Sequence, residues 1–303
     1  MGGTPVFTGL SAFPLTPLDD DRLDEHAYTR LIGRLASSGV DSIGVLGSTG
    51  SYAYLTRAER SRAAALAVQH AGGTPVIAGI GALRARHVLE HADDVQQAGV
   101  AAVLLAPVSY QPLSDDEVYH LYERVTAHLS VPLVVYDNPR TTGFTFTDDL
   151  YAAVAKLPGV ASVKVPPLPA DPAIARDRVA ALRGLLPAGV TIGVSGDQVA
   201  AVSLRAGCDA WYSVIAGTLP DLALTITRAG SPRQARAASD RLRPLFELFA
   251  AYGSLRVVAT IAAHLGLTAA GCLPSPLRPL DTAARAAVLQ ALAVIDATPL
   301  PRE

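Results

Sequence analysis

Short apolar segments alternate with longer segments of mixed polarity along the first two thirds of the chain. The short segments are rich in aliphatic, often β-branched residues and are bounded by polar residues, glycine or proline, which is typical of buried strands. They cover residues 9–13, 42–46, 76–79, 102–105, 133–136, 161–165, 191–194 and 210–214. The segments between them are long enough for helices, so the alternation predicts parallel βα units.

Local sequence signals support the helices between these strands. The segments Thr56 to Glu59 and Ser114 to Glu117 have the spacing of capping boxes, in which a hydroxyl and a carboxylate satisfy the free backbone N–H groups at a helix start. Gly39, Gly72 and Gly99 follow three of the helical segments and are candidates for the left-handed residue that ends a helix.

Eight strands of this kind predict a closed TIM (β/α)₈ barrel. Strands that are apolar throughout, such as residues 102–105, need cover on both faces, which an outer ring of helices and a packed interior supply. An open doubly wound sheet is the alternative. After residue 214 helix follows helix, so we expect a barrel domain of residues 1–222 and a C-terminal helical region of residues 223–303 packed on it.

Composition excludes several kinds of partner. With 25 basic and 27 acidic residues, the formal net charge of -2 predicts neither nucleic-acid binding nor attraction to an anionic membrane. No apolar run reaches the ~18 residues of a membrane span. The two cysteines and the absence of an export pattern in the first eight residues indicate the reducing cytoplasm.

Lysine is rare, because only Lys156 and Lys164 occur in 303 residues. Strand alternation directs the Lys164 side chain into the barrel, where burial favours the neutral amine. Lowering its pKa by ~3 units from ~10.4 corresponds to about 4 kcal/mol. A neutral amine can attack a ketone and arginine cannot, so Lys164 is the candidate Schiff-base residue. The alternative is a salt bridge at the barrel mouth.

Two further groups could assist such a lysine. Tyr136 ends the neighbouring strand and could carry protons, although tyrosine at a strand end is also a common packing residue. The loop of residues 47–50 offers Ser48 and Thr49, whose hydroxyls could hold a carboxylate and relay protons toward Tyr136. By spacing alone, an ordinary turn is the favoured interpretation of this loop.

Other chemistries lack support in the sequence, and we expect no metal and no cofactor. The glycines at positions 79 and 81 are followed by Arg84 where a dinucleotide-binding fingerprint has its third glycine. His87 and His91 share one helix face with Asp94, but that helix should lie outside the barrel, and a solvated polar face is the expected interpretation.

With these residues identified, the chain resembles the dihydrodipicolinate synthase/N-acetylneuraminate lyase family of class I aldolases over most of its length. Residues 47–50 match the family's Gly-(Ser/Thr)-Thr-Gly loop, Tyr136 its catalytic tyrosine, Lys164 its Schiff-base lysine, and residues 195–197 its Ser-Gly-Asp segment. The resemblance implies that pyruvate binds through its carboxylate to this loop and against Tyr212. It also implies a homo-oligomer, a dimer or a tetramer.

The sequence departs from the synthase branch of that family. Ser51 stands where that branch has glutamate, and residues 107–109 read Pro-Val-Ser where it has Pro-Tyr-Tyr, with Tyr110 next to them. Thr141 occupies the position of the arginine that grips the second substrate, and Arg140 lies one residue earlier. A displaced guanidinium rarely keeps a bidentate clamp.

The predicted function is therefore a Schiff-base aldolase or lyase that acts on pyruvate or another 2-oxo acid, with an aldehyde as second partner. Lys164 would form the imine, Tyr136 would shuttle protons, and Thr49 with Ser48 would orient Tyr136 and the carboxylate. The alternatives are 4-hydroxy-tetrahydrodipicolinate synthase, which uses pyruvate and aspartate semialdehyde, and a non-catalytic barrel that binds 2-oxo acids.

Overall fold

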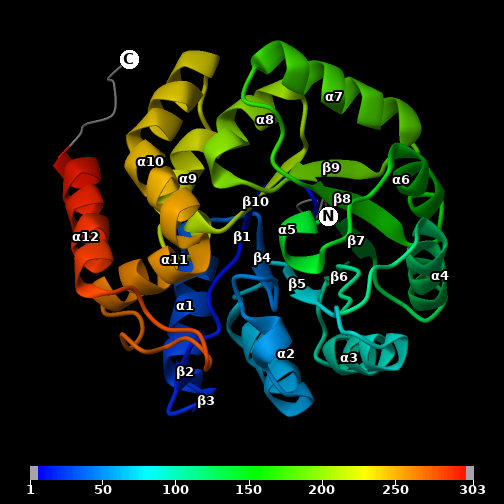
Figure 1. Ribbon diagram of the computed structural model, residues 1–303, viewed down its shortest axis with the longest axis horizontal. Helices are drawn as coiled ribbons and strands as arrows, with labels where there is room; N and C mark the ends of the chain where they lie inside the picture. Colours follow the sequence, from blue (N-terminus) through cyan, green and yellow to red (C-terminus); the bar gives the residue numbers. More distant parts are fainter. Residues whose placement is uncertain (1–5, 298–303) are drawn as a thin grey trace.

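Eight parallel strands close into a barrel in the computed structural model, which describes residues 6–297 (Figure 1). The strands are β1 Gly9–Ala12, β4 Ser42–Val45, β5 Val76–Gly79, β6 Ala102–Leu105, β7 Leu133–Tyr136, β8 Val160–Val165, β9 Thr191–Val194 and β10 Ala210–Ser213. β1 pairs with both β4 and β10, so the sheet has no open edge. The predicted TIM barrel is confirmed, and each predicted strand boundary lies within one residue of the observed one.

A ring of helices surrounds the barrel and covers the outer face of the strands (Figure 1). The helices are α1 Glu25–Ser38, α2 Arg57–His70, α3 Ala85–Gln97, α4 Asp115–Thr126, α6 Asp148–Val154, α7 Pro172–Leu185, α8 Ala200–Ala206 and α9 Pro220–Thr227. Both predicted capping boxes are present, at the starts of α2 and α4. A short additional helix, α5 Pro139–Thr142, lies at the mouth of the barrel in front of the strands.

Strand alternation divides the core into an inner and an outer part. Side chains such as Phe13, Leu104 and Tyr136 form a buried cluster inside the barrel. Leu10 and Ile43 point the other way and join the large cluster between strands and helices. Both parts are apolar because every strand is covered on both faces.

The pattern of the sequence did not indicate a small hairpin that the structure contains. It consists of β2 Leu18–Asp19 and β3 Arg22–Leu23, paired antiparallel. Two residues per strand are too short to produce a recognisable alternation. The signal that could have indicated it is the pair Asp20 and Asp21 in the turn between the strands. Both residues adopt left-handed φ angles, of 45° and 60°. Aspartate tolerates this conformation better than most residues.

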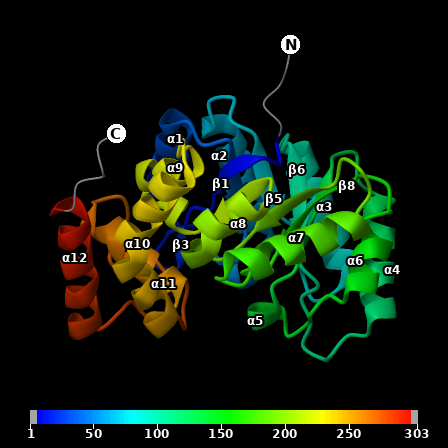
Figure 2. The same cartoon turned by 90° about the horizontal axis from the view of Figure 1, so that it is seen from above.

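Three further helices, α10 Pro232–Tyr252, α11 Ser254–His264 and α12 Thr282–Ala297, gather on one flank of the barrel (Figures 1 and 2). α10 packs on α8 and α9, and α9 contacts β1 and α1. The expected domain boundary after residue 222 falls inside α9, which is a helix of the barrel ring. Residues 1–5 and 298–303 of that division lie outside the described residues.

Candidate active site

Lys164 and Tyr136 lie side by side at the carboxyl ends of β8 and β7. The two residues are register partners across the parallel pair, so their side chains lie on the same face of the sheet, and their contacts with Phe13 and Tyr212 place them inside the barrel. The Lys164 side chain is buried, with only 4 % of the residue exposed. In a TIM barrel, this end of the strands is where functional groups are found.

Three aromatic rings surround the Lys164 amine. Its Nζ lies 3.9 Å from the ring centroid of Phe13, 4.1 Å from that of Tyr136 and 5.5 Å from that of Tyr212. Burial lowers the pKa of Lys164 to about 7, although the carboxylate of Asp197 acts in the opposite direction. At neutral pH a large share of this amine is therefore uncharged and able to act as a nucleophile.

Glycines on the strands make room for these rings. A Cβ atom at Gly44 would overlap the ring of Phe13, and one at Gly193 would overlap the ring of Tyr212. The Tyr212 hydroxyl shares a hydrogen bond of 2.8 Å with Ser162 Oγ. The aromatic surroundings of Lys164 therefore depend on glycine at inward positions of neighbouring strands.

The Tyr136 hydroxyl belongs to a cluster of three polar groups. Ser48 Oγ lies 3.4 Å from Tyr136 Oη, and Asn138 Nδ2 donates to Tyr136 Oη at 2.9 Å and to Ser48 Oγ at 3.1 Å. Burial raises the pKa of Tyr136 to about 12, and the hydrogen bond with Ser48 acts against that rise. At neutral pH the phenol keeps its proton and can donate it.

The loop of residues 47–50 turns sharply above the barrel. Leu46 and Ser51, which flank it, have left-handed φ angles of 55° and 53°, an uncommon conformation for residues other than glycine. Ser48 is the loop residue that reaches Tyr136. Thr49 is buried beside it, and within residues 6–297 its side chain makes no hydrogen bond to Tyr136.

Asp197 follows the carboxyl end of β9 and connects it to the end of β10 by hydrogen bonds. Its buried carboxylate accepts hydrogen bonds from Trp211 Nε1 at 3.0 Å, Val214 N at 3.2 Å and Ile215 N at 2.7 Å. Burial raises the pKa of Asp197, and these hydrogen bonds oppose the rise by favouring the charged form. The sequence singled out this residue only as part of a motif, and the structure gives it an anchoring position.

Two residues of this arrangement were not anticipated from the sequence. Phe13 stood at the end of a predicted strand, where its position could have indicated a place in the barrel mouth. Asn138 could have been noticed because it is the only asparagine in the chain.

The interpretation of His91 as part of a solvated face was wrong. His91 is buried, and its burial, with the nearby charge of Arg60, lowers its pKa to about 4. Throughout the described part of the chain, no group of three or more histidine, cysteine or acidic side chains is placed to hold a metal ion. Nor do residues 6–297 include a helix long and apolar enough to cross a membrane.

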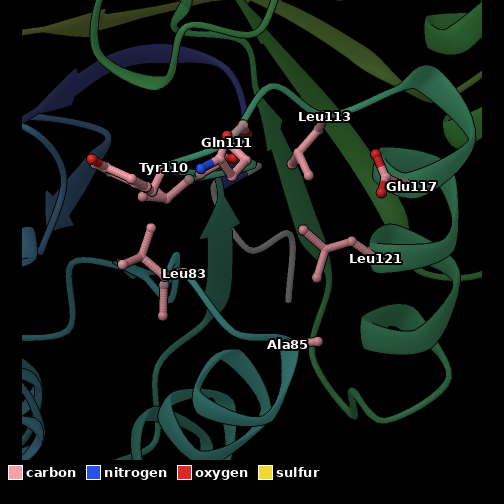
Figure 3. A pocket seen from close by; sticks show the side chains of 10 residues that line it. Leu83, Ala85, Tyr110, Gln111, Leu113, Glu117 and Leu121 are labelled. Atoms are coloured by element: carbon pink, nitrogen blue, oxygen red, sulfur yellow. Dashed lines mark hydrogen bonds between the residues drawn. The ribbon is translucent and has the colours of Figure 1, made fainter.

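Beside the barrel mouth lies a pocket of about 380 Å³, between the loops that follow β5 and β6 and the start of α4 (Figure 3). Leu83 and Tyr110 line it and are largely exposed, at 65 % and 89 %. Arg140, on α5, is also exposed. Tyr110 and Arg140, the neighbours of the positions at which the chain departs from the synthase pattern, thus both lie at the surface.

A (β/α)₈ barrel that holds a buried, partly neutral lysine beside a protonated tyrosine has the arrangement of a lysine-dependent lyase. The sequence model of the Dihydrodipicolinate synthetase family matches residues 6–295, and the chain belongs to that family. The members of this family are lyases of the aldolase type, so the chain is an enzyme of this class.

Relatives of known sequence or structure agree with this assignment. An uncharacterized DapA-like lyase of Halobacterium salinarum is 32 % identical over 94 % of this chain and 90 % of its own length. A 4-hydroxy-tetrahydrodipicolinate synthase of Anaplasma marginale is 31 % identical over 79 % of this chain and 78 % of its own. The crystal structure of dihydrodipicolinate synthase from Agrobacterium tumefaciens superposes with a TM-score of 0.92 at 43 % identity, covering 97 % of this chain and 100 % of that one.

Proposed function

We propose that this enzyme captures pyruvate, or a closely related 2-oxo acid, as a Schiff base on Lys164. The observation that carries the proposal is a buried amine, with a pKa lowered to about 7, whose Nζ lies 4.1 Å from the ring centroid of Tyr136. The family to which the chain belongs supports the same chemistry.

Imine formation needs proton transfers that Tyr136 is placed to make. The neutral Lys164 amine adds to the C2 carbonyl, and Tyr136 gives its proton to the resulting alkoxide while it takes one from the new ammonium. Tyr136 then protonates the hydroxyl of this carbinolamine, which leaves as water, and the nitrogen lone pair forms the C=N bond. The iminium remains, together with a tyrosinate that is reprotonated through Ser48 from solvent.

The iminium then acts as an electron sink. Transfer of a proton from C3 to the Tyr136 oxygen, before solvent reprotonates it, gives an enamine that can add to an aldehyde, and the reverse sequence cleaves a carbon–carbon bond. Ser48 and Thr49 are the candidates for holding the substrate carboxylate, and Tyr212 for contacting its carbon chain. In this proposal, Thr49 helps to hold the carboxylate from its position in the loop, and Ser48 also orients the Tyr136 hydroxyl through their hydrogen bond.

Reductive trapping tests the central step. We expect borohydride, added with pyruvate, to leave a reduced three-carbon adduct on the peptide that contains Lys164, as measured by mass spectrometry. A Lys156→Arg variant, which changes the other, exposed lysine, should trap the same adduct. Turnover by a folded Lys164→Ala variant, or an adduct on Lys156 alone, would contradict the proposal.

The second substrate separates two candidate activities. Relatives named 4-hydroxy-tetrahydrodipicolinate synthase favour aspartate semialdehyde. The displaced and exposed Arg140 favours a different aldehyde, because a clamp on a carboxylate needs a fixed guanidinium. Incubation with pyruvate and a panel of aldehydes, read by product mass, distinguishes them. Trapping of pyruvate without any product would instead favour a binding barrel.

We also propose that the chain works in the cytoplasm as a homo-oligomer, a dimer or a tetramer. The exposed Leu83 and Tyr110 side chains support a contact surface beside the active-site mouth. The two cysteines, Cys208 and Cys272, are buried and unpaired, which suits a reducing compartment. Sedimentation analysis should give more than one chain per particle, and Tyr110→Asp should shift the particle toward the monomer. A monomeric native protein would contradict this assembly.

A further inference from the structure

Asn138 closes a triangle of hydrogen bonds around the Tyr136 hydroxyl. Its Nδ2 lies 2.9 Å from Tyr136 Oη and 3.1 Å from Ser48 Oγ, and these two oxygens lie 3.4 Å apart. The three groups come from the loop after β4, from the end of β7 and from the residue before α5. All three belong to one chain, so this cluster forms without a partner subunit.

The backbone of Asn138 is held independently of this contact. Its carbonyl oxygen accepts hydrogen bonds from Thr141 N at 3.0 Å and from Thr142 N at 3.1 Å, at the start of α5. Asparagine before a helix usually accepts a bond from the first turn with its side chain, and Asn138 makes no such bond. Its amide is directed instead to the two hydroxyls in the barrel mouth.

The chemistry of a primary amide nitrogen limits what this contact can do. The nitrogen carries two hydrogens and no available acceptor site, so it can donate one hydrogen to each oxygen but cannot receive a proton. Within the triangle, Tyr136 can exchange a proton only with Ser48. When Tyr136 has given its proton to substrate, the oxygen keeps the Asn138 donor, and a hydrogen bond to a charged oxygen is stronger than one to a neutral oxygen.

We propose that Asn138 is a positioning residue for the imine chemistry, which fixes the Tyr136 and Ser48 hydroxyls and stabilises the tyrosinate formed when Tyr136 donates its proton. The inference rests on the proposed function of Lys164 and Tyr136. It assigns to the only asparagine of the chain a role that does not involve contact with substrate.

Exchange of the pyruvate methyl protons with deuterated water provides a test that needs no aldehyde. The exchange requires the iminium and its enamine, and NMR follows it directly. At pH 8 we expect Asn138→Leu to lower kcat for exchange about 10- to 100-fold, the effect of one hydrogen bond to a charged group. The KM for pyruvate should change by less than about threefold, because the lost interaction forms mainly after substrate is bound.

Asn138→Asp distinguishes positioning from packing. Aspartate has the shape of asparagine, but its carboxylate cannot donate, so its kcat should fall at least as far as that of Asn138→Leu. Lowering the pH should then restore part of the Asn138→Asp activity relative to Asn138→Leu, because a protonated carboxyl regains one donor. Thr145→Ala, at an exposed position in the segment after α5, serves as the control and should exchange at the native rate.

The possible outcomes separate the two hypotheses. A native kcat in Asn138→Asp, or a raised KM with an unchanged kcat in both variants, would overturn the role of Asn138 while leaving the Lys164 proposal intact. Failure of the native enzyme to exchange or to trap pyruvate would overturn both. Loss of kcat in the two Asn138 variants, with trapping at Lys164 retained, supports both.

Discussion

Burial of Lys164 governs both its reactivity and its energetic cost. Burial removes water from the Lys164 ammonium and so destabilises its charged form. The three aromatic rings around Nζ replace only part of that hydration. The same loss makes the neutral amine available near pH 7. The proposed nucleophile and the local destabilisation therefore have one physical origin.

The rate of adduct formation should report this pKa. Below pH 7 the neutral fraction of Lys164 rises about tenfold per pH unit, and above its pKa of about 7 it levels off. We expect the initial rate of pyruvate trapping by borohydride to follow that curve between pH 5.5 and 9. A rate that still rises tenfold between pH 8 and 9 would indicate an ordinary, solvated lysine.

Stability should show the same pKa with a defined sign. The folded pKa of Lys164 lies below its unfolded value, so the unfolded chain binds more protons between about pH 7 and 10.5. Replacement by methionine should raise the free energy of unfolding at pH 6 by up to about 5 kcal/mol. The gain should shrink as pH rises through that window, as measured by urea unfolding at several pH values. A gain that does not change with pH would contradict the assigned burial effect.

At the scale of elements, the inward faces of the strands combine large rings with glycines. Phe13 on the segment after β1 occupies space above Gly44 of β4, and Tyr212 of β10 occupies space above Gly193 of β9. A large side chain on one strand thus lies against a glycine on the next strand. Because the interior is close-packed, there is little space for an added side chain at these glycines.

Gly193→Ala should therefore destabilise the barrel and disturb the site. The added methyl group would displace the Tyr212 ring, and overpacking of this kind typically costs about 1–3 kcal/mol. Pyruvate trapping should slow because the surroundings of Lys164 change. Gly33→Ala is the matched control, since a Cβ there meets nothing within 4 Å, and in the middle of α1 it should stabilise by up to about 1 kcal/mol. Equal effects of the two substitutions would argue against the steric explanation.

At the scale of the whole molecule, the C-terminal helices share their core with the barrel. Ile261 of α11 belongs to the same buried cluster as Leu10 of β1 and Ile43 of β4. The backbone of Leu18 also donates to the carbonyl oxygen of Cys272 at 2.9 Å. Contacts of this kind couple residues 223–297 to the barrel.

Unfolding should consequently be a single transition. Trp211 of β10, the only tryptophan, reports on the barrel by its fluorescence. We expect Ile261→Ala to lower the free energy of unfolding measured at Trp211 by about 2–5 kcal/mol, although it lies outside the barrel. An unchanged Trp211 transition would mean that the proposed helical region, residues 223–303, unfolds as a separate unit.

The sequence by itself determined the barrel, its strand boundaries and the pairing of Lys164 with Tyr136. Short apolar runs and helix caps are local properties of the sequence, and the ends of adjacent parallel strands must meet. Only the tertiary structure decided that Ser48 is the loop residue that bonds to Tyr136, that Asn138 joins them, that His91 is buried, and that three rings enclose the Lys164 amine. These features depend on loop geometry and on side chains from distant strands, because contacts between residues far apart in the chain leave no periodic trace in it.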